Sequence, residues 1–224
     1  MMPSMHKTIV CFDLDDTLYK EIDYLKSAYH EIADYLREEF GFHDLYGEMF
    51  RYYREGKDVF QEILDSYMCP VAKKSLIKMY RGHKPHIGLD ADTKQVLDSL
   101  HQNPDCTICM ITDGRSVTQW NKIKALGLDC YQKEKMNFLI SEEHGHIKPD
   151  SYAYELIESF FPDYSYIYVG DNPQKDFLAP NKLGWKTACL LDDGRNIHKQ
   201  DFELSEEYLP KYKISDIKEI IKLI

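Results

Sequence analysis

The stretch Thr8–Tyr19 reads TIVCFDLDDTLY, and it decides the fold of this 224-residue chain. Its first five residues are apolar or β-branched, and a short continuous run of this kind is typical of a strand buried in a parallel sheet. Three acids, Asp13, Asp15 and Asp16, follow where the strand would end. Ligands of open α/β sheets bind just beyond the carboxyl ends of the strands, so the stretch predicts a site as well as a fold.

The composition restricts the partners that the protein can bind. The chain is 43% hydrophobic, which is enough to form a core, and it carries a formal net charge of -10. Non-specific binding to nucleic acid depends on Lys and Arg side chains that neutralise phosphates, so this acidic chain predicts no nucleic-acid partner. An anionic substrate would need a metal ion or a local basic group to offset the repulsion.

The sequence shows no membrane or targeting segment. Residues 1–7 lack the apolar region of a signal peptide, and no run approaches the roughly 18 apolar residues of a membrane span. We therefore expect a cytoplasmic protein without a membrane partner, and nothing in the sequence specifies its oligomeric state. Cys106 and Cys109 form a C-x-x-C pair, but their place in a strand-like run favours a core position over a thiol redox site.

Residues 20–88 predict a helical insert. Apolar side chains recur there at spacings of three and four, which indicates helices over residues 25–40, 44–54, 58–67 and 71–80. A strand-helix-strand unit needs only about 30 residues or a little more, so roughly 60 residues are surplus before the next strand. An insert at this place would lie over the strand ends like a lid. We therefore expect a core domain of residues 1–19 and 89–224, and a helical cap domain of residues 20–88.

From Asp92 onward, strand and helix patterns alternate. Strands are predicted over residues 107–111, 138–140, 166–169 and 187–191, and helices over 92–102, 117–126, 151–161, 174–183 and 215–223. Alternation of this kind predicts an α/β fold, a doubly wound, Rossmann-like parallel sheet with helices on both faces. Residues 194–211 are charged and irregular, and we expect a loop there.

Polar residues follow three of the predicted strands, and a lysine precedes a predicted helix. In chain order these are Asp13 and Asp15, then Thr112, then Lys148 before Pro149, then Asp171 with Asp176 five residues later. Taken singly, such residues cap helices, form turns or face water. Parallel strands bring their carboxyl ends to one edge of the sheet, so the ordered set predicts one site.

This ordered set resembles the four motifs of the haloacid dehalogenase superfamily, whose members are mostly magnesium-dependent phosphatases. The resemblance covers nearly the whole chain and implies a helical cap after the first motif. It implies that Asp13 is the nucleophile and Asp15 the general acid and base. It also implies that Thr112 and Lys148 contact the phosphoryl group, that Asp171 binds Mg²⁺, that Asp176 supports the metal or Lys148, and that Gly170 lets the backbone approach.

The chemistry of the residues agrees with these roles. A carboxylate can attack phosphorus and form a covalent intermediate, provided that positive charge offsets the repulsion from the phosphate. Mg²⁺ prefers oxygen ligands, and we expect them from Asp13, the Asp15 carbonyl, Asp171 and Asp176. The expected substrate-binding residues are Thr112, Asp113, Gly114, Arg115 and Lys148. For Arg115 a surface ion pair is an equal alternative, and Asp16 and Asp113 could also brace loops.

The sequence thus predicts a phosphoric monoester hydrolase. It would use Mg²⁺ and an aspartyl-phosphate intermediate to hydrolyse a small phosphorylated metabolite, such as a nucleoside monophosphate or a sugar phosphate. An acid at Asp15 favours a phosphatase over a dehalogenase, whose halide leaving group needs no proton. The alternatives are a phosphomutase of the same family, a non-catalytic binding module on the same fold, and a thiol redox protein that uses Cys106 and Cys109.

Overall fold

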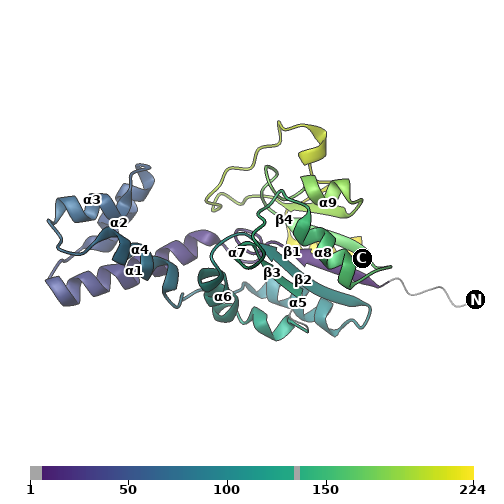
Figure 1. Ribbon diagram of the computed structural model, residues 1–224, viewed down its shortest axis with the longest axis horizontal. Helices are drawn as coiled ribbons and strands as arrows, with labels where there is room; N and C mark the ends of the chain where they lie inside the picture. The colour runs from purple at the N-terminus through teal and green to yellow at the C-terminus, as the bar shows by residue number, and fades with distance from the viewer. Residues whose placement is uncertain (1–6, 134–136) are drawn as a thin grey trace, which may run out of the picture.

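A six-stranded parallel sheet forms the centre of the protein (Figure 1), in a computed structural model that describes residues 7–133 and 137–224. The strand order is β3-β2-β1-β4-β5-β6, and every pairing between neighbours is parallel. The bounds are β1 Thr8–Phe12, β2 Cys106–Thr112, β3 Phe138–Ile140, β4 Ser165–Gly170, β5 Lys186–Leu190 and β6 Tyr212–Ile214. The chain runs outward from β1 to β3 and returns to the other side of β1, which is the predicted doubly wound arrangement.

Helices cover both faces of the sheet, which explains why β1 is apolar throughout. Val10 and Phe12 belong to the cluster packed under α5 (Ala91–Gln102), α6 (Ser116–Ala125) and the 3₁₀ helix η4 (Ile217–Leu223). Ile9 and Cys11 belong to the opposite cluster, under α8 (Tyr152–Phe160) and α9 (Leu178–Lys182). A strand buried on both faces cannot alternate polar and apolar residues.

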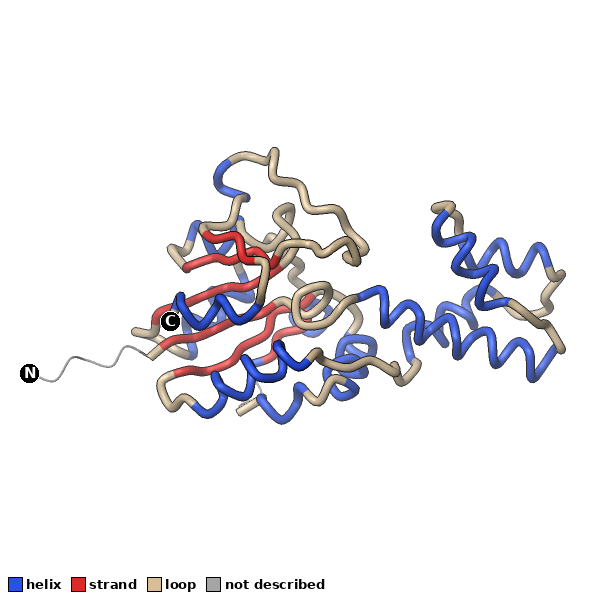
Figure 2. Tube along the Cα trace, turned by 180° about the vertical axis from the view of Figure 1, so that it is seen from behind, coloured by secondary structure: helices blue, strands red, loops and turns tan. Residues whose placement is uncertain are grey.

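The insert after β1 forms four helices that stand apart from the sheet, as Figure 2 shows. They are α1 (Glu21–Phe40), α2 (Leu45–Arg54), α3 (Val59–Ser66) and α4 (Lys73–Gly82). Their facing sides share an apolar cluster of their own, which includes the fully buried Leu36, Met49 and Leu76. The predicted α-helical cap is confirmed as a structural unit, while the division at residues 20 and 88 stays a prediction and residues 1–6 lie outside the described part.

Three elements differ from the sequence prediction. The helix expected over 174–183 is only α9, because residues 172–176 form a turn in which the amide N–H groups of Lys175 and Asp176 bond the Asn172 carbonyl. The C-terminal helix is the 3₁₀ helix η4, not an α-helix. Strand β6 was not predicted, because its three residues gain a strand partner only from β5.

The loops hold a few short elements that the sequence did not indicate. They are η1 (Leu128–Tyr131), α7 (Ser141–His144) and η3 (Glu206–Tyr208), the last of them inside the expected loop of residues 194–211. Cys106 and Cys109 belong to clusters on opposite faces of the sheet, since side chains alternate along β2. Two cysteines that point to opposite faces cannot form a disulfide, which removes the thiol redox alternative.

Candidate active site

Asp13 lies directly beyond β1 and is held by a buried lysine. Lys148 Nζ donates to Asp13 Oδ1 at 2.6 Å and to Asp176 Oδ1 at 2.7 Å. The side chains of Lys148, Asp13 and Asp176 are 1%, 4% and 0% exposed. Burial raises the pKa of Asp13 to about 6, although Lys148 acts in the opposite direction. Burial acts to lower the pKa of Lys148, but Asp13 and Asp176 outweigh it and raise this pKa, which favours the charged ammonium.

The loop after β2 contributes a second set of polar groups. Thr112 is the last residue of β2 and is 1% exposed. Asp113 Oδ1 accepts from the backbone N–H of Lys148 at 3.2 Å, which ties this loop to the lysine. The N–H of Gly114 donates to Ser141 Oγ at 2.9 Å, and Gly114 has a φ of 145° that favours glycine. Asp113 therefore braces the loop on which the lysine lies.

A third carboxylate completes an acidic cluster at the sheet edge. Asp13, Asp171 and Asp176 are buried, and one oxygen from each lies within 4.8 Å of the other two. Burial, Asp176 and Asp13 raise the pKa of Asp171 to about 9. Three carboxylates this close repel one another unless a cation lies among them, and an all-oxygen set is what Mg²⁺ prefers. The donor set therefore suits a magnesium ion.

Within this cluster Asp176 is the most constrained carboxylate. Its Oδ1 accepts from Lys148, and its Oδ2 accepts from the backbone N–H of Asn172 at 2.8 Å and of Asp171 at 3.2 Å. A Cβ added to Gly170 would lie 2.6 Å from Asp176 Oδ2, so only glycine permits this approach. Asp176 thus orients the lysine and the loop that carries Asp171.

Asp15 faces a different set of partners from Asp13. Its Oδ1 accepts from Lys122 Nζ at 2.7 Å and from Tyr19 Oη at 2.5 Å, and its Oδ2 accepts from Gln119 Nε2 at 3.0 Å. Burial raises the pKa of Asp15, but Lys122 together with these hydrogen bonds outweighs burial and lowers it. Gln119 Nε2 also donates to Thr112 Oγ1 at 2.6 Å, which links Asp15 to the end of β2.

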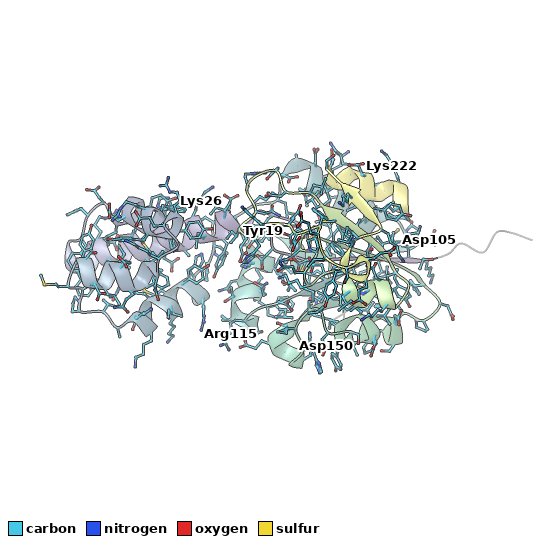
Figure 3. The ribbon with its side chains drawn as sticks, turned by 90° about the horizontal axis from the view of Figure 1, so that it is seen from above. Tyr19, Lys26, Asp105, Arg115, Asp150 and Lys222 are labelled. Carbon is cyan, nitrogen blue, oxygen red and sulfur yellow. The ribbon has the colours of Figure 1, made fainter. Side chains whose placement is uncertain are left out.

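Arg115 and Asp16 lie at the margin of this site. Arg115 is exposed and pairs with Glu142 at 2.5 Å, in a groove of about 650 Å³ between α4 and α6. Figure 3 places Tyr19 and Arg115 where the helical insert meets the core. Asp16 braces two segments, accepting from the N–H of Glu21 and of Ile197, each at 2.9 Å. Arg115 thus forms a surface ion pair, which was the alternative to a role in substrate binding.

Sequence reasoning missed several residues that bind the predicted ones. Lys148 also donates to Tyr168 Oη at 3.0 Å, and Asn196 Nδ2 donates to Asp171 Oδ2 at 3.0 Å. Lys175 lowers the pKa of Asp13. The sequence pattern could have revealed Gln119 and Lys122. Both lie on the same helix face as the buried Ile123 and Leu126, where polar residues are unexpected. No sequence pattern could have revealed Asn196, because it lies in an irregular loop.

The class of protein follows from comparison with a family model. The model of haloacid dehalogenase-like hydrolases matches residues 10–190, and the chain belongs to this family. The matched part contains Asp13, Thr112, Lys148 and Asp171, and it includes the helical insert. The predicted family membership is confirmed.

The similar proteins include a phosphatase and two solved structures. The chain is 24% identical to the glyceraldehyde 3-phosphate phosphatase of Methanocaldococcus jannaschii, over 96% of each chain. It superposes on a protein assigned as a HAD-hydrolase of Bacillus subtilis, crystallised with magnesium, with a TM-score of 0.69 and 19% identity over 97% of this chain and 98% of that one. It also superposes on a HAD phosphatase of Thermococcus onnurineus, with a TM-score of 0.60 and 18% identity over 96% of this chain and 97% of that one.

The family model and the phosphatase relative confirm the prediction of a phosphoric monoester hydrolase of the haloacid dehalogenase type. The structural likenesses confirm the parallel sheet with its helical cap. In the part of the chain that the structure describes, no helix combines the length and the apolar character needed to cross a membrane.

Proposed function

We propose that the protein is a Mg²⁺-dependent phosphatase that hydrolyses a small phosphomonoester through an aspartyl-phosphate on Asp13. One observation carries the proposal. The Asp13 carboxylate is buried beside Lys148, and one of its oxygens lies within 4.8 Å of one oxygen of Asp171 and one of Asp176 at the edge of the sheet. A nucleophilic carboxylate needs this combination, because positive charge must offset the charge of an incoming phosphate.

In the first step, an Asp13 oxygen forms a bond to phosphorus while the bond from phosphorus to the leaving oxygen breaks. Asp15 enters this step protonated, a form that the negative charge of a bound phosphate favours, and it gives its proton to that oxygen, so that an alcohol departs instead of an alkoxide. Lys148 holds Asp13 in place and faces the phosphoryl oxygens, and Thr112 Oγ1 donates a hydrogen bond to them. Asp15 lies two residues from Asp13 and is tied to Thr112 through Gln119, which supports this division of roles.

In the second step, a water oxygen bonds to phosphorus and the bond to Asp13 breaks. Asp15, now a carboxylate, accepts a proton from the water, so the enzyme returns to its initial state and inorganic phosphate is released. The hydrogen bonds from Lys122, Tyr19 and Gln119 favour the carboxylate form of Asp15, which is the form that this step requires.

The proposed metal ligands are Asp13, Asp171 and the main-chain carbonyl of Asp15, with Asp176 supporting Lys148 and the loop. Mg²⁺ bound there would offset the charge of the carboxylates and of the phosphate. Because Asp176 already accepts four hydrogen bonds, two of them from backbone N–H groups, we assign it the supporting role.

The substrate that we propose is a nucleoside monophosphate or a sugar phosphate. The name of the archaeal relative favours a phosphorylated sugar as the first compound to test. Arg115, with its neighbours in the groove beside α4, is a further candidate contact for the substrate. A cytoplasmic setting remains part of the proposal and agrees with the burial of Cys11, Cys106 and Cys189 as thiols.

The test is phosphate release from a panel of sugar phosphates and nucleoside monophosphates, with and without Mg²⁺. Wild type, Asp13→Asn and the exposed control Asp129→Asn are compared. We expect Mg²⁺-dependent release that is lost only in Asp13→Asn. Release that survives in Asp13→Asn would contradict the proposed nucleophile. If a folded wild type releases no phosphate but converts one sugar phosphate into its isomer, the phosphomutase alternative holds.

A further inference from the structure

Lys122 is a buried cation that the proposed reaction does not use directly. Its side chain is 4% exposed, and its Nζ lies 2.7 Å from Asp15 Oδ1 and 3.8 Å from Glu21 Oε1. The ammonium also lies 4.5 Å from the centre of the Tyr24 ring. Buried ammonium groups are retained in proteins when a carboxylate pairs with them, so Lys122 and Asp15 hold each other in place.

The helix that carries Lys122 is fixed against the connections between the core and the insert. Thr118 Oγ1 donates to the Arg81 carbonyl at 2.9 Å. Asn121 Nδ2 donates to the carbonyls of Gly82 and His83 at 3.1 and 3.0 Å, where α4 ends. The position of Lys122 relative to the insert is therefore set by α6.

The same helix fixes Asp15 from a second direction. Gln119, one turn before Lys122, donates to Asp15 Oδ2 at 3.0 Å and to Thr112 Oγ1 at 2.6 Å. Tyr19 donates to Asp15 Oδ1 at 2.5 Å from the side of the insert. Both oxygens of Asp15 are thus bound, and two of the three donors belong to α6.

We propose that Lys122 is the positioning residue for Asp15, holding its carboxyl group where it can pass a proton to the leaving oxygen and later take one from water. This inference rests on the proposed function of the same site. An acid or base works only within hydrogen-bond reach of the proton that it moves, and a displacement of about 1 Å costs on the order of 100-fold in rate. Lys122 touches neither substrate nor phosphorus; it acts through Asp15.

The leaving group provides a readout that separates positioning from stability. An alkyl phosphate such as glycerol 2-phosphate needs a proton on its departing oxygen, whereas p-nitrophenyl phosphate releases a stable phenolate that does not. The kinetic constant kcat/KM reports the steps up to the departure of the leaving group. A misplaced Asp15 must therefore lower kcat/KM for the alkyl ester far more than for the aryl ester, while a general loss of folded enzyme lowers both equally.

The experiment compares wild type, Lys122→Met, Lys122→Arg and the control Lys124→Met, which changes an exposed lysine on the same helix. In Lys122→Met we expect kcat/KM for glycerol 2-phosphate to fall by about 10- to 100-fold, with a far smaller change for p-nitrophenyl phosphate. Lys122→Arg should recover most of the alkyl activity, and Lys124→Met should match wild type. Equal losses for the two esters, or no loss, would overturn the proposal.

Two further measurements keep the outcome clear. If Lys122→Met does not fold, as thermal unfolding would show, Lys122→Gln keeps a hydrogen-bond donor in the buried position and should show the same selective loss. An equal loss for both esters in that variant overturns the proposal too. The variant Asp13→Asn distinguishes a failure of the proposed phosphatase function from a failure of the role proposed for Lys122. If it retains activity, or if wild type releases phosphate from no member of the panel, the proposed function fails and this inference fails with it.

Discussion

Lys148 Nζ lies 2.6 Å from Asp13 Oδ1, although 135 residues separate the two in the chain. The pair is formed because β1 ends beside the loop that carries Lys148. The same edge of the sheet holds the carboxylates of Asp13, Asp171 and Asp176. Lys148 is the buried cation that offsets part of their charge. We therefore expect the balance between this cation and the three carboxylates to affect both the stability of the protein and the reactivity of the site.

Replacement of Lys148 by Met should destabilise the protein. It leaves buried carboxylates without their cation, which costs about 3–5 kcal/mol when one member of a buried pair is removed. Urea unfolding with a metal chelator present, at a pH above the ordinary range of carboxylates, measures the loss. The control Lys182→Met removes an exposed pair with Glu207 and should change stability little. Equal stability of the two variants would contradict the electrostatic role of Lys148.

Removal of the Asp171 carboxylate should abolish stabilisation by Mg²⁺. For wild type, Mg²⁺ at 100 times its dissociation constant should add about 2.7 kcal/mol to the free energy of unfolding. In Asp171→Asn the metal-free protein should be about as stable as wild type near neutral pH, because burial and the neighbouring acids raise the pKa of Asp171 to about 9 and already favour its uncharged form, but Mg²⁺ should add nothing. Thermal unfolding with and without Mg²⁺ measures both effects. Asp129→Asn is the control, and a Mg²⁺ response that persists in Asp171→Asn would remove this residue from the ligand set.

Substitution of Gly170 by Ala should disturb the site through Asp176. The new Cβ would lie 2.6 Å from Asp176 Oδ2, and this fully buried side chain has no room to move. We expect a loss of about 1–3 kcal/mol, typical of overpacking, together with a lower phosphatase rate. The matched control is Gly47→Ala, on the exposed side of α2, which meets no atom within 4 Å. That substitution should leave stability unchanged or raise it by up to about 1 kcal/mol.

His83 should make stability depend on pH in the weakly acidic range. Its side chain is buried between Tyr24 and Tyr80, and its Nδ1 lies 2.8 Å from the Tyr80 carbonyl. Burial lowers the pKa of His83 below 6.5 in the folded protein. As the pH falls, the unfolded chain therefore binds the proton first. The contribution of His83 to the free energy of unfolding is complete above pH 6.5 and is lost as the pH falls through the pKa of His83 in the folded protein.

The comparison of His83→Gln with the exposed control His198→Gln tests this dependence. Urea unfolding between about pH 7.5 and pH 5.5 should show that wild type and His198→Gln lose more stability than His83→Gln over this range. The slopes are compared instead of the absolute stabilities, because His83→Gln also changes packing. Identical slopes for all three proteins would contradict the role assigned to His83.

Much of the fold could be predicted because local patterns reflect long-range burial. The strand at Thr8–Phe12 is apolar throughout since it is covered on both faces, and the spacing of the next strand revealed the helical insert. The parts that could not be predicted depend on partners distant in the chain. Strand β6 is only three residues long and exists because β5 offers it an edge, and the turn of residues 172–176 replaces a helix because Asp176 binds the backbone around it.

The candidate site, like the fold, has a part that the sequence predicts and a part that it does not. The sequence by itself determined which groups reach the sheet edge, because Asp13 and Asp171 follow strands, Thr112 ends one, and parallel strands end together. Only the tertiary structure decided what each group faces. Gln119 and Lys122 bind Asp15 from a helix more than 100 residues away, and Asp176 accepts a hydrogen bond from Lys148. The physical reason is that strand direction is a local property of the chain, whereas the pairing of buried charges depends on the packing of the whole fold.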